Sequence, residues 1–302
     1  MAFGFETTVV ITGPSWESIG AETAITLAKG SPAMLVLLGR DIERLKPVME
    51  KIHAIDSEIV TKFVQIHLDS LKSVRHAAQQ ILEDSAIAKI HILINNAGIM
   101  ACPYSKTEDG IERQFATNHI GHFLLTNLLT PKILAASPDA RVVNVSSYGN
   151  VLSNVLEDPS FNDGKEYVSF LSYGQSKTAN VLMALGLNKR LGPRGLKAFA
   201  LCPGSVPTNL RRFMNPDTMK EGAEIISKSQ AAMPQRKTPQ QGCATTVRAA
   251  IDPNLNVDQS IFLSDTQVTS SPTVVAPYSL DQSNADRVWT LSEKLVGEAF
   301  EY

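Results

Sequence analysis

Residues 7–20 read TTVVITGPSWESIG, a β-branched run that passes directly into a glycine-containing loop. Residues 7–12 have the composition of a buried strand. Residues 19–29, which follow the loop, have the apolar spacing of a helix. A strand, a glycine loop and a helix in this order are typical of the first part of a dinucleotide-binding unit, in which the helix N-terminus faces a pyrophosphate. This stretch therefore predicts the class of fold.

The remaining chain alternates short apolar runs with helical segments. Further strands are predicted at residues 33–38, 60–67, 90–95, 141–146, 196–201 and 261–263, and helices at residues 42–53, 71–84, 108–136, 171–191 and 285–298. The strands show little polar alternation, as expected when both faces of a sheet are covered. The pattern predicts an α/β fold, a Rossmann-type doubly wound parallel sheet, in a single domain that spans residues 1–302.

Two segments lie outside this alternation. Residues 205–239 contain Phe213, Met214 and Met219 and are too apolar for a solvated linker, so a helical substrate lid is predicted there. Flexible methionines suit an irregular hydrophobic ligand, although packing of a lid helix on the body accounts for them equally well. A Ser/Thr/Pro-rich run at residues 264–283 is expected to be a surface excursion, and it begins a C-terminal extension over residues 264–302.

Composition narrows the class of protein. The chain has 302 residues, 43% of them hydrophobic, and a formal net charge of −2, which argues against a nucleic-acid surface. No apolar run approaches the roughly eighteen residues that span a membrane, and the N-terminus has no signal-type core. Cys102, Cys202 and Cys243 are scattered without metal-ligand spacing, which indicates thiols in a reducing, cytoplasmic compartment. His119 and His122 have no third ligand nearby, so no metal site is predicted.

Four loop residues are candidates for binding the pyrophosphate of a dinucleotide: Gly13, Ser15, Ile19 and Gly20. Glycine lets the backbone approach phosphates, and the positive end of the helix dipole faces them. An ordinary strand-to-helix loop, which often contains one or two glycines, is the alternative.

Arg40 lies twenty residues after Gly20, where a unit that prefers NAD usually carries an acid for the ribose 2′-hydroxyl. A guanidinium can bind a 2′-phosphate through two hydrogen bonds, so NADP(H) is predicted in preference to NAD(H). Pairing of Arg40 with the neighbouring Asp41 is the alternative for this residue.

Tyr173 and Lys177 lie one helical turn apart, so their side chains share a helix face. An ammonium close to a phenol favours the phenolate, which lowers the pKa of the phenol and makes it a useful proton donor near neutral pH. No other tyrosine in the chain has a lysine four residues later. Taken alone, the motif is also compatible with a pair on a helix surface.

The motifs follow one order along the chain: Thr12-Gly13 through Ile19-Gly20, Asn95-Asn96-Ala97-Gly98, Asn118, Ser146-Ser147, Tyr173 with Lys177, and Cys202-Pro203-Gly204. In this order and placement they resemble the short-chain dehydrogenase/reductase family in its single-domain form, over roughly residues 5–250. Residues 117–126, which read TNHIGHFLLT, resemble the branch that holds retinol dehydrogenases and many fungal biosynthetic reductases.

The resemblance implies catalytic roles for Ser147, Tyr173, Lys177 and Asn118. Ser147 would donate a hydrogen bond to the substrate carbonyl oxygen, and Tyr173 would give that oxygen its proton as hydride reaches the carbon. Lys177 would hold the nicotinamide ribose while lowering the pKa of Tyr173. Asn118 would anchor a water on the proton path to Lys177, and Ser146 would be structural.

The resemblance also implies cofactor contacts beyond the glycine loop. Asn96 and Ala97 would line the adenosine-side ribose, unless they form a plain strand-end turn. Asp69 would meet the adenine amino group, or cap the helix that follows it, or do both. Val206 and Thr208 would orient the carboxamide and the phosphates, unless they belong to a lid loop without specific contacts.

Two departures from the family pattern affect the site. The glycine loop is one residue longer than the common spacing, and Ser18 stands where the middle glycine usually lies. Serine enters positive φ at a greater cost than glycine, so the loop either takes another path or bears strain. The interval between Ser147 and Tyr173 is also longer than in the simplest members, and we expect it to form a wall of the substrate pocket.

The function predicted from the sequence is that of a metal-free, NADP-dependent oxidoreductase. It would transfer a hydride between the nicotinamide and a hydrophobic ketone, aldehyde or secondary alcohol, as a biosynthetic ketoreductase of secondary metabolism. Two alternatives stay open: a non-catalytic NADP-binding sensor or scaffold, and an isomerase or dehydratase that uses the cofactor transiently. The family often pairs subunits through the helices that hold residues 118–129 and 173–191, which makes a homodimer a hypothesis; core burial explains the apolar content of these helices equally well.

Overall fold

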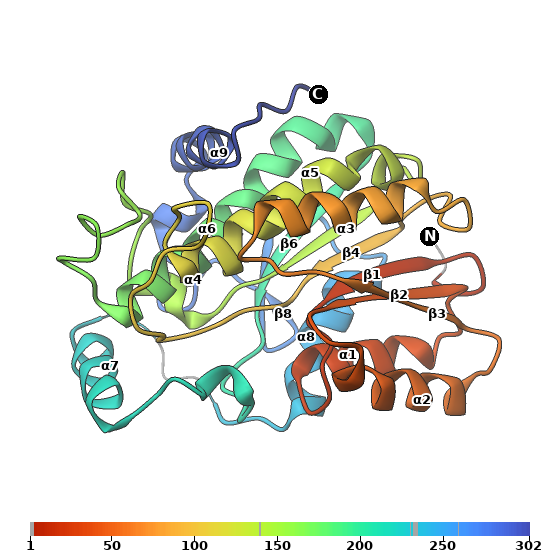
Figure 1. Cartoon of the computed structure of the whole chain (residues 1–302), viewed down its shortest axis with the longest axis horizontal. Helices are drawn as coiled ribbons and strands as arrows, with labels where there is room; N and C mark the ends of the chain where they lie inside the picture. The colour runs from red at the N-terminus through yellow and green to blue at the C-terminus, as the bar shows by residue number, and fades with distance from the viewer. Residues whose placement is uncertain (1–2, 139, 230, 232–234, 259) are drawn as a thin grey trace.

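The computed structural model describes residues 3–138, 140–229, 231, 235–258 and 260–302. Its centre is an eight-stranded sheet with the strand order β3-β2-β1-β4-β5-β6-β7-β8 (Figure 1). The strands are β1 (Thr8–Thr12), β2 (Met34–Gly39), β3 (Val60–Gln65), β4 (Ile92–Asn95), β5 (Arg141–Val145), β6 (Lys197–Cys202), β7 (Phe262–Ser264) and β8 (Gln267–Val268). All neighbouring strands are parallel except β7 and β8. The predicted Rossmann-type sheet in a single domain is confirmed.

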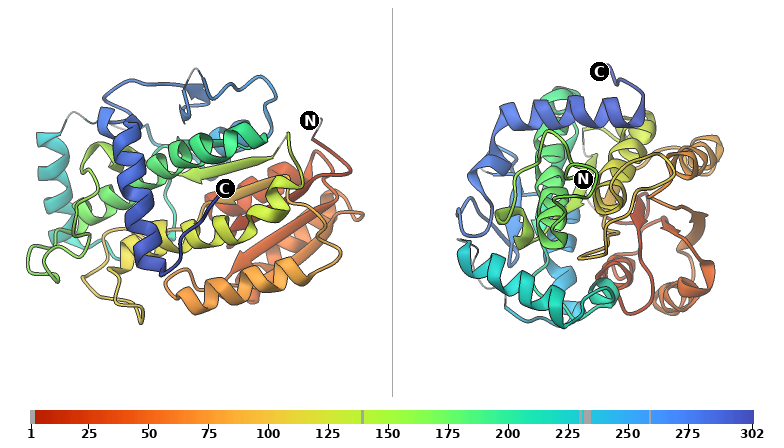
Figure 2. Two further views of the ribbon diagram at one scale, coloured as in Figure 1. Left: turned by 90° about the horizontal axis from the view of Figure 1, so that it is seen from above. Right: turned by 60° about the vertical axis from the view of Figure 1, so that its left-hand side comes forward.

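Helices cover both faces of the sheet (Figures 1 and 2). They are α1 (Ile19–Ala28), α2 (Lys46–Ile55), α3 (Leu71–Glu83), α4 (Arg113–Phe115), α5 (Gly121–Leu134), α6 (Ser169–Leu191), α7 (Pro216–Lys228), α8 (Pro239–Ile251) and α9 (Gln282–Val296). Val9 and Ile11 of β1 belong to the core formed with α1, α2 and α8, whereas Val10 belongs to the core formed with α3, α5 and α6. Because successive strand residues point to opposite faces, one apolar run supplies both cores.

The strand order reverses beside β1, because β2 and β3 lie on one side of it and β4 to β8 on the other. In the register of the sheet, Val9 is level with Ile92, and Ile11 with Ile94. The loops that follow β1 and β4 therefore leave the same edge of the sheet next to each other. Ligands of open parallel sheets bind at this kind of reversal.

The helix predicted over residues 108–136 starts later and changes its geometry. Glu112 caps it, because the carboxylate accepts hydrogen bonds from two backbone N–H groups of α4 at 2.9 and 2.8 Å. Helix α4 passes into a π-helical turn, η2 (Ala116–Ile120), in which the N–H of Gly121 bonds to the carbonyl five residues back. Such wide turns are frequent at functional sites, and this one contains Asn118.

The predicted lid segment contains helix α7. The helix begins with a capping box, in which the Asn215 side chain accepts from the N–H of Thr218 at 2.9 Å and the Thr218 hydroxyl accepts from the N–H of Asn215 at 2.8 Å. Gly222 faces α6, and a Cβ on it would lie 2.5 Å from the ring of Phe170. Residues 230 and 232–234 of the predicted lid lie outside the described residues.

The run at residues 264–283 is partly buried, which differs from the surface excursion expected for it. Val275 and Ala276 are at most 2% exposed. The side chain of Asn150 accepts a hydrogen bond from the N–H of Ala276 at 2.9 Å and donates one to the carbonyl of Val274 at 3.0 Å. These bonds allow the run to be buried, because its backbone polar groups keep partners.

Helix α9 lies across α5 and α6 (Figure 2). Its Trp289 packs edge-on against Phe123 of α5, with ring centroids 4.9 Å apart, and Arg190 of α6 lies 4.1 Å from the indole centroid. Gly186 of α6 makes room for the indole, since a Cβ there would lie 2.7 Å from it. The C-terminal helix therefore covers the joint face of the two long helices.

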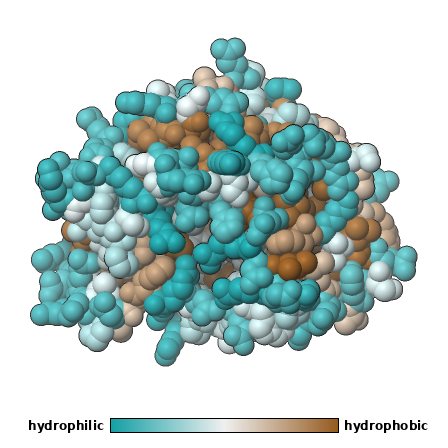
Figure 3. Space-filling model, viewed as in Figure 1, coloured by the Kyte–Doolittle hydropathy of each residue, from teal (hydrophilic) through white to brown (hydrophobic). Residues whose placement is uncertain are grey.

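The molecular surface seen in Figure 3 is mostly hydrophilic, and its apolar residues form separate patches. Within the part of the chain that the structure describes, no helix combines the length and the apolar character needed to cross a membrane.

The packing of α5 gives a test of the fold. A Cβ on Gly121 would lie 2.3 Å from the backbone carbonyl oxygen of Leu68, which cannot move aside as a flexible side chain can. We expect Gly121→Ala to lower the free energy of unfolding by about 1–3 kcal/mol in chemical denaturation. Gly192→Ala is the matched control, because no atom lies within 4 Å of its added Cβ. Equal stability of the two variants would contradict this packing.

Candidate active site

The loop after β1 and the turn after β4 are in close contact. Gly13 has φ of +67°, and a Cβ on it would lie 2.8 Å from the Cβ of Ala97; a Cβ on Gly20 would lie 2.4 Å from the Nδ2 atom of Asn96. Asn96 also donates from Nδ2 to the carbonyl of Thr12 at 2.8 Å. The structure therefore brings four predicted cofactor residues together at the reversal of the strand order.

Ser18 stands where the middle glycine of the family usually lies, and it does not adopt a left-handed conformation. It has φ of −108° and caps α1, because its hydroxyl oxygen accepts from the N–H of Ala21 at 3.1 Å. The left-handed conformation falls on Glu17 instead, with φ of 62°. The N–H of Ser18 bonds to the carbonyl of Ser15 at 3.1 Å, which closes the extra turn. The longer loop thus takes another path and keeps the N-terminus of α1, at Ile19, directed to the same edge.

Arg40 follows β2 and is exposed. Asp41 accepts a hydrogen bond from a backbone N–H of the short helix η1 (Ile42–Arg44) at 3.0 Å, and no ion pair between described residues joins it to Arg40. Four arginines act on one another here. Burial lowers the pKa of Arg212, and the like charges of Arg40, Arg113 and Arg44 add to this lowering. This edge of the sheet favours an anion.

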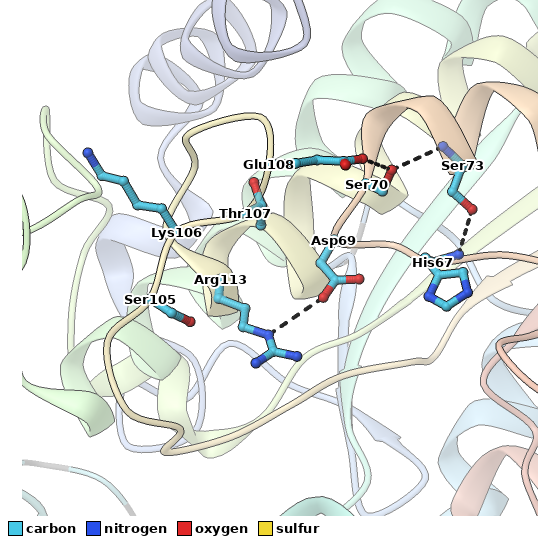
Figure 4. Close-up of a pocket in the computed structure, with 9 residues that line it drawn as sticks. All are labelled: His67, Asp69, Ser70, Ser73, Ser105, Lys106, Thr107, Glu108 and Arg113. Atoms are coloured by element: carbon cyan, nitrogen blue, oxygen red, sulfur yellow. Dashed lines mark hydrogen bonds and ion pairs between the residues drawn. The ribbon is translucent and has the colours of Figure 1, made fainter.

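Asp69 lies beside a cavity of about 510 Å³ (Figure 4). The cavity is lined by His67, Asp69, Ser70, Ser73, residues 105–108 and Arg113. The carboxylate of Asp69 lies 3.5 Å from the Nε atom of Arg113. Helix α3 is capped by Ser70, which accepts from the N–H of Ser73 at 3.3 Å. The alternative role of Asp69 as the helix cap is therefore wrong, and its contact with adenine stays a prediction.

The four predicted catalytic residues come from three elements around the end of β5. Ser147 follows β5, Tyr173 and Lys177 lie in α6, and Asn118 lies in the π-helical turn. Tyr173 is 5% exposed and Lys177 3% exposed. A Cβ on Gly98 would lie 3.2 Å from the Oδ1 atom of Asn118 and 3.5 Å from the Nζ atom of Lys177, so these two side chains flank the turn after β4.

The side chain of Asn118 is held by the protein. Its Oδ1 atom accepts from the N–H of Ile99 at 2.8 Å, and its Nδ2 atom donates to the carbonyl of Ile99 and to the hydroxyl of Ser176, both at 2.9 Å. An amide in this position makes three hydrogen bonds without a ligand. What Asn118 can offer to the active site is its backbone carbonyl rather than its side chain.

The two serines after β5 have different environments. Ser146 donates its hydroxyl hydrogen to the carbonyl of Lys177 at 2.7 Å, which is a structural role. Ser147 accepts from the N–H of Gly149 at 3.1 Å, and its hydroxyl interacts with Tyr173. Ser147 is therefore the serine whose hydroxyl lies next to Tyr173, and its catalytic role stays a prediction.

Burial decides the protonation of Tyr173 and Lys177. Burial raises the pKa of Tyr173 to about 12, and the hydrogen bond with Ser147 opposes it. Lys177 is not among the groups that act on the phenol, and its Nζ atom lies 5.6 Å from the ring centroid. The expected lowering of the Tyr173 pKa by Lys177 is therefore not found. Burial lowers the pKa of Lys177 itself to about 8, because it has no carboxylate partner among the described residues.

Val206 and Thr208 lie on the loop after β6. Val206 packs against α8, since a Cβ on Gly242 would lie 2.6 Å from its Cγ2 atom and 3.5 Å from the Cγ1 atom of Ile19. Thr208 caps the short helix η5 (Asn209–Arg211) by accepting from a backbone N–H at 3.3 Å. The structure thus places Val206 near the first residue of α1, and the proposed contacts of both residues with a cofactor stay predictions.

A buried polar cluster around Glu112 was not predicted from the sequence. Its carboxylate accepts from the hydroxyl of Ser172, next to Tyr173, at 2.9 Å, and burial raises the pKa of Glu112. Gln114 donates to the hydroxyl of Tyr167 at 2.7 Å, and this hydroxyl donates to the carbonyl of Cys102 at 2.9 Å. The cluster fixes the start of α6 against the long interval before it. No sequence pattern distinguishes Glu112 from an exposed helix cap.

The described residues contain no group of three or more His, Cys, Asp or Glu side chains that could hold one metal ion. His119 and His122 bond instead to protein groups, through a hydroxyl of α9 and through Thr12 and Asn118 respectively.

With a doubly wound sheet, a glycine loop at its reversal and a Ser-Tyr-Lys-Asn group, the chain belongs to the short-chain dehydrogenase family; the model of the family described as short chain dehydrogenase matches residues 7–219. It falls in a branch similar to retinol dehydrogenases. Retinol dehydrogenase 12 of Mus musculus is 35% identical over 296 residues, which cover 97% of this chain and 87% of that protein.

Other relatives agree with this assignment. The short-chain dehydrogenase/reductase prx1 of Penicillium roqueforti is 37% identical over 298 residues, or 95% of this chain and 84% of that protein. A crystal structure of a protein from Mycobacterium paratuberculosis has a TM-score of 0.71 at 29% identity and covers 99% of this chain and 97% of that one. The NADPH-bound carbonyl reductase from chicken fatty liver shares the fold, with a TM-score of 0.62 at 21% identity over 87% of this chain and 98% of that one.

Because the ammonium of Lys177 is buried, we expect its removal to raise the free energy of unfolding. The folded pKa of Lys177, about 8, lies below its usual 10.5, so the folded state disfavours the cation and carries the whole cost below pH 8. Lys177→Met should raise the free energy of unfolding at pH 7 by about 1–3 kcal/mol. The difference should shrink between pH 8 and 10.5, where the folded state has lost the charge and the unfolded state still keeps it, and should vanish above pH 10.5.

Chemical denaturation over this pH range measures the effect. The carbonyl of Val145, to which Lys177 donates, keeps a second bond from Asn180 at 3.2 Å, so the substitution leaves it satisfied. Lys72→Met on the exposed side of α3 is the control and should leave stability nearly unchanged. A less stable Lys177→Met variant would show that the ammonium is not a net cost.

Proposed function

We propose that this protein is an NADP-dependent reductase that converts a hydrophobic ketone or aldehyde to the alcohol. The observation that carries the proposal is the convergence of Ser147, Tyr173, Lys177 and Asn118 next to the glycine loop. A non-catalytic NADP-binding sensor would need only the loop. It gives no reason to keep a lysine buried without a carboxylate partner one turn from a buried tyrosine.

The site residues suit a carbonyl reduction. NADPH, when bound, supplies the hydride that the carbonyl carbon receives. Ser147 holds the carbonyl oxygen by a hydrogen bond, and Tyr173 transfers its hydroxyl proton to that oxygen, so the neutral carbonyl becomes a neutral alcohol. A pKa near 12 keeps Tyr173 protonated at neutral pH, which is the state that a proton donor needs. Lys177 is still mostly cationic at pH 7, so it can return a proton to Tyr173, and a water anchored by Asn118 would resupply the proton to Lys177.

The residues present fit a dinucleotide. The close approach of Gly13 and Gly20 to the turn after β4 leaves no room for larger side chains, as expected where backbone must reach phosphates. Ser15, Ile19 and Gly20 would bind the pyrophosphate, Asn96 and Ala97 the adenosine-side ribose, and Asp69 the adenine. Val206 and Thr208 would hold the carboxamide side, and Lys177 the nicotinamide ribose.

The preference for NADP over NAD rests on Arg40. Its guanidinium is exposed at the edge where three other arginines add positive charge, and Asp41 caps η1 rather than pairing with it. Arg44, the last residue of η1, is tied to the glycine loop because its carbonyl accepts from the N–H of Trp16 at 2.9 Å. Both arginines would meet a 2′-phosphate, which NAD lacks.

A hydrophobic substrate is supported by the wall before α6. Tyr167 packs edge-on against Tyr104 and Phe161, with ring centroids 5.2 and 5.7 Å apart, and the Glu112 cluster holds its hydroxyl. Helix α7 approaches the same region through Gly222 and Phe170, which supports its role as a lid. The retinol-dehydrogenase-like branch and the Penicillium relative lead us to propose a biosynthetic ketoreductase of secondary metabolism.

Two further points concern the protein as a whole. We propose a cytoplasmic location, because all three cysteines are buried free thiols, as is usual in a reducing compartment. The homodimer hypothesis requires α5 and α6 to be accessible to a second copy. Helix α9 occupies part of this face through Trp289, so we do not propose a dimer formed there.

Turnover tests the proposed reaction. Purified protein should oxidise NADPH in the presence of apolar ketones, aldehydes or quinones, followed by the loss of NADPH absorbance. Tyr173→Phe should lower kcat by about 10²–10⁴-fold, because it removes the proton donor. Tyr302→Phe removes a phenol hydroxyl that bonds to Asn127 of α5 and not to a catalytic residue. This variant should keep wild-type activity. Undiminished turnover by Tyr173→Phe would rule out this mechanism.

The cofactor preference has its own test. Arg40→Ala should raise the KM for NADPH by about 10–100-fold and leave the KM for NADH unchanged, because only NADPH offers a 2′-phosphate to the guanidinium. Arg194→Ala, in the turn after α6, is the control for loss of a surface arginine. If the wild-type protein uses NADH as well as NADPH, or Arg40→Ala affects both alike, the assignment of Arg40 is wrong.

A further inference from the structure

A second buried network lies beneath the catalytic residues and centres on His122 of α5. The Nε2 atom of His122 lies 2.8 Å from the hydroxyl oxygen of Thr12, at the end of β1. Its Nδ1 atom lies 3.0 Å from the backbone carbonyl oxygen of Asn118. All three residues are at most 1% exposed. One imidazole therefore joins the strand that leads into the glycine loop to the π-helical turn.

The hydrogen bonds of Thr12 fix which nitrogen of His122 carries the hydrogen. The N–H groups of Asn96 and Ala97 both donate to the Thr12 hydroxyl oxygen at 3.0 Å and occupy its two lone pairs. The hydroxyl hydrogen is then left for Nε2 of His122, which accepts it. The ring hydrogen accordingly lies on Nδ1 and is donated to the carbonyl of Asn118, which can only accept.

His122 stays neutral in this position. Burial and, to a smaller extent, the charge of Lys177 on α6 lower the pKa of His122 to about 4. The hydrogen bond to Asn118 opposes this shift. His119, one turn earlier in the chain, is also buried, and its pKa of about 3 leaves it neutral at pH 7. A group that holds one protonation state near neutral pH does not pass protons itself; it orients what it binds.

We propose that His122 is a positioning residue of the active site, which holds the backbone carbonyl of Asn118 in place, and that Thr12 sets the tautomer that makes this possible. The inference rests on the proposed reductase function, because the Asn118 carbonyl matters for turnover only if it serves the proton path to Lys177. The Asn118 side chain is already bonded to Ile99 and Ser176, so the part of Asn118 that His122 holds is its backbone carbonyl oxygen.

The network also couples two halves of the site. The same Thr12 hydroxyl receives the N–H groups of Asn96 and Ala97, which belong to the proposed cofactor turn. Thr12 and His122 link that turn by hydrogen bonds to Asn118. The cofactor loop and the proton path are thus parts of one hydrogen-bonded unit.

Two amide substitutions separate the two bonds of the imidazole. His122→Asn places an amide nitrogen near the position of Nδ1, and so keeps the donor to Asn118 while losing the bond to Thr12. His122→Gln places an amide oxygen near the position of Nε2, and so keeps an acceptor for the Thr12 hydroxyl hydrogen while losing the donor to Asn118. His119→Gln is the matched control, since His119 is equally buried and bonds to Ser292 of α9 instead.

Steady-state kinetics with NADPH and the best ketone across pH give the first readout, after thermal melting has shown that each variant folds. We expect kcat of His122→Gln to fall about tenfold, the worth of one hydrogen bond to a buried group, with little change in KM. The basic limb of its pH profile should move to lower pH, because the Asn118 carbonyl no longer helps to stabilise the ammonium. His122→Asn and His119→Gln should stay within about threefold of the wild type and keep its pH profile.

Two kinetic outcomes would overturn the proposal. If His122→Gln keeps the wild-type kcat and pH profile, the Asn118 carbonyl does not need the imidazole. If the Asn and Gln variants lose activity equally, with no change of the pH profile, His122 only fills space.

A second measurement tests the tautomer of His122 without variants or turnover. Nitrogen chemical shifts of ¹⁵N-histidine-labelled wild-type protein should show His122 with its hydrogen on Nδ1 throughout the neutral range. A hydrogen on Nε2, or a charged imidazole at pH 7, would refute the inference. Failure of the wild type to reduce any carbonyl compound would count against the proposed function alone, and the tautomer would still be read.

Discussion

The structure depends on the close approach of the two loops at the reversal of strand order. The parallel register of β1 and β4 brings Gly13 against Ala97 and Gly20 against Asn96, at distances that exclude a Cβ on either glycine. This contact joins the two halves of the sheet at their carboxyl edge. It also places backbone N–H groups and the N-terminus of α1 where a pyrophosphate can reach them. Every other candidate residue is positioned relative to this junction, either on a neighbouring strand end or on the helix behind it.

The catalytic residues are kept at a cost to stability. Lys177 is nearly fully buried without a carboxylate partner, and burial holds its pKa near 8. Tyr173 is likewise buried, and its raised pKa keeps the phenol neutral. A core built for stability alone would hold apolar side chains at these positions. Polar groups that are costly to bury and close to one another are typical of sites where charge moves during a reaction, and the neutral His122 beneath them keeps the supporting framework from titrating with them.

Much of the fold and part of the site followed from the sequence. The helix at residues 71–84 and the strand at 141–146 were predicted within a residue or two, because apolar spacing and strand runs are local properties. Helix α8 was missed, although its capping box of Thr238 and Gln241 is readable. The π-helical turn, the left-handed Glu17 and the direction of the Tyr173 pKa depend on hydrogen bonds and burial that only the packed chain defines.

The central claim is that these residues direct a hydride from NADPH to a carbonyl carbon. The most direct test is to supply NADPH in which both hydrogens at C4 of the nicotinamide are replaced by deuterium, and to analyse the alcohol product by mass spectrometry. The account predicts one deuterium on the carbinol carbon in the wild-type product, and about 10²–10⁴-fold slower formation of that product with Tyr173→Phe. An alcohol without deuterium, or tight NADPH binding with no alcohol from any carbonyl compound, would contradict it.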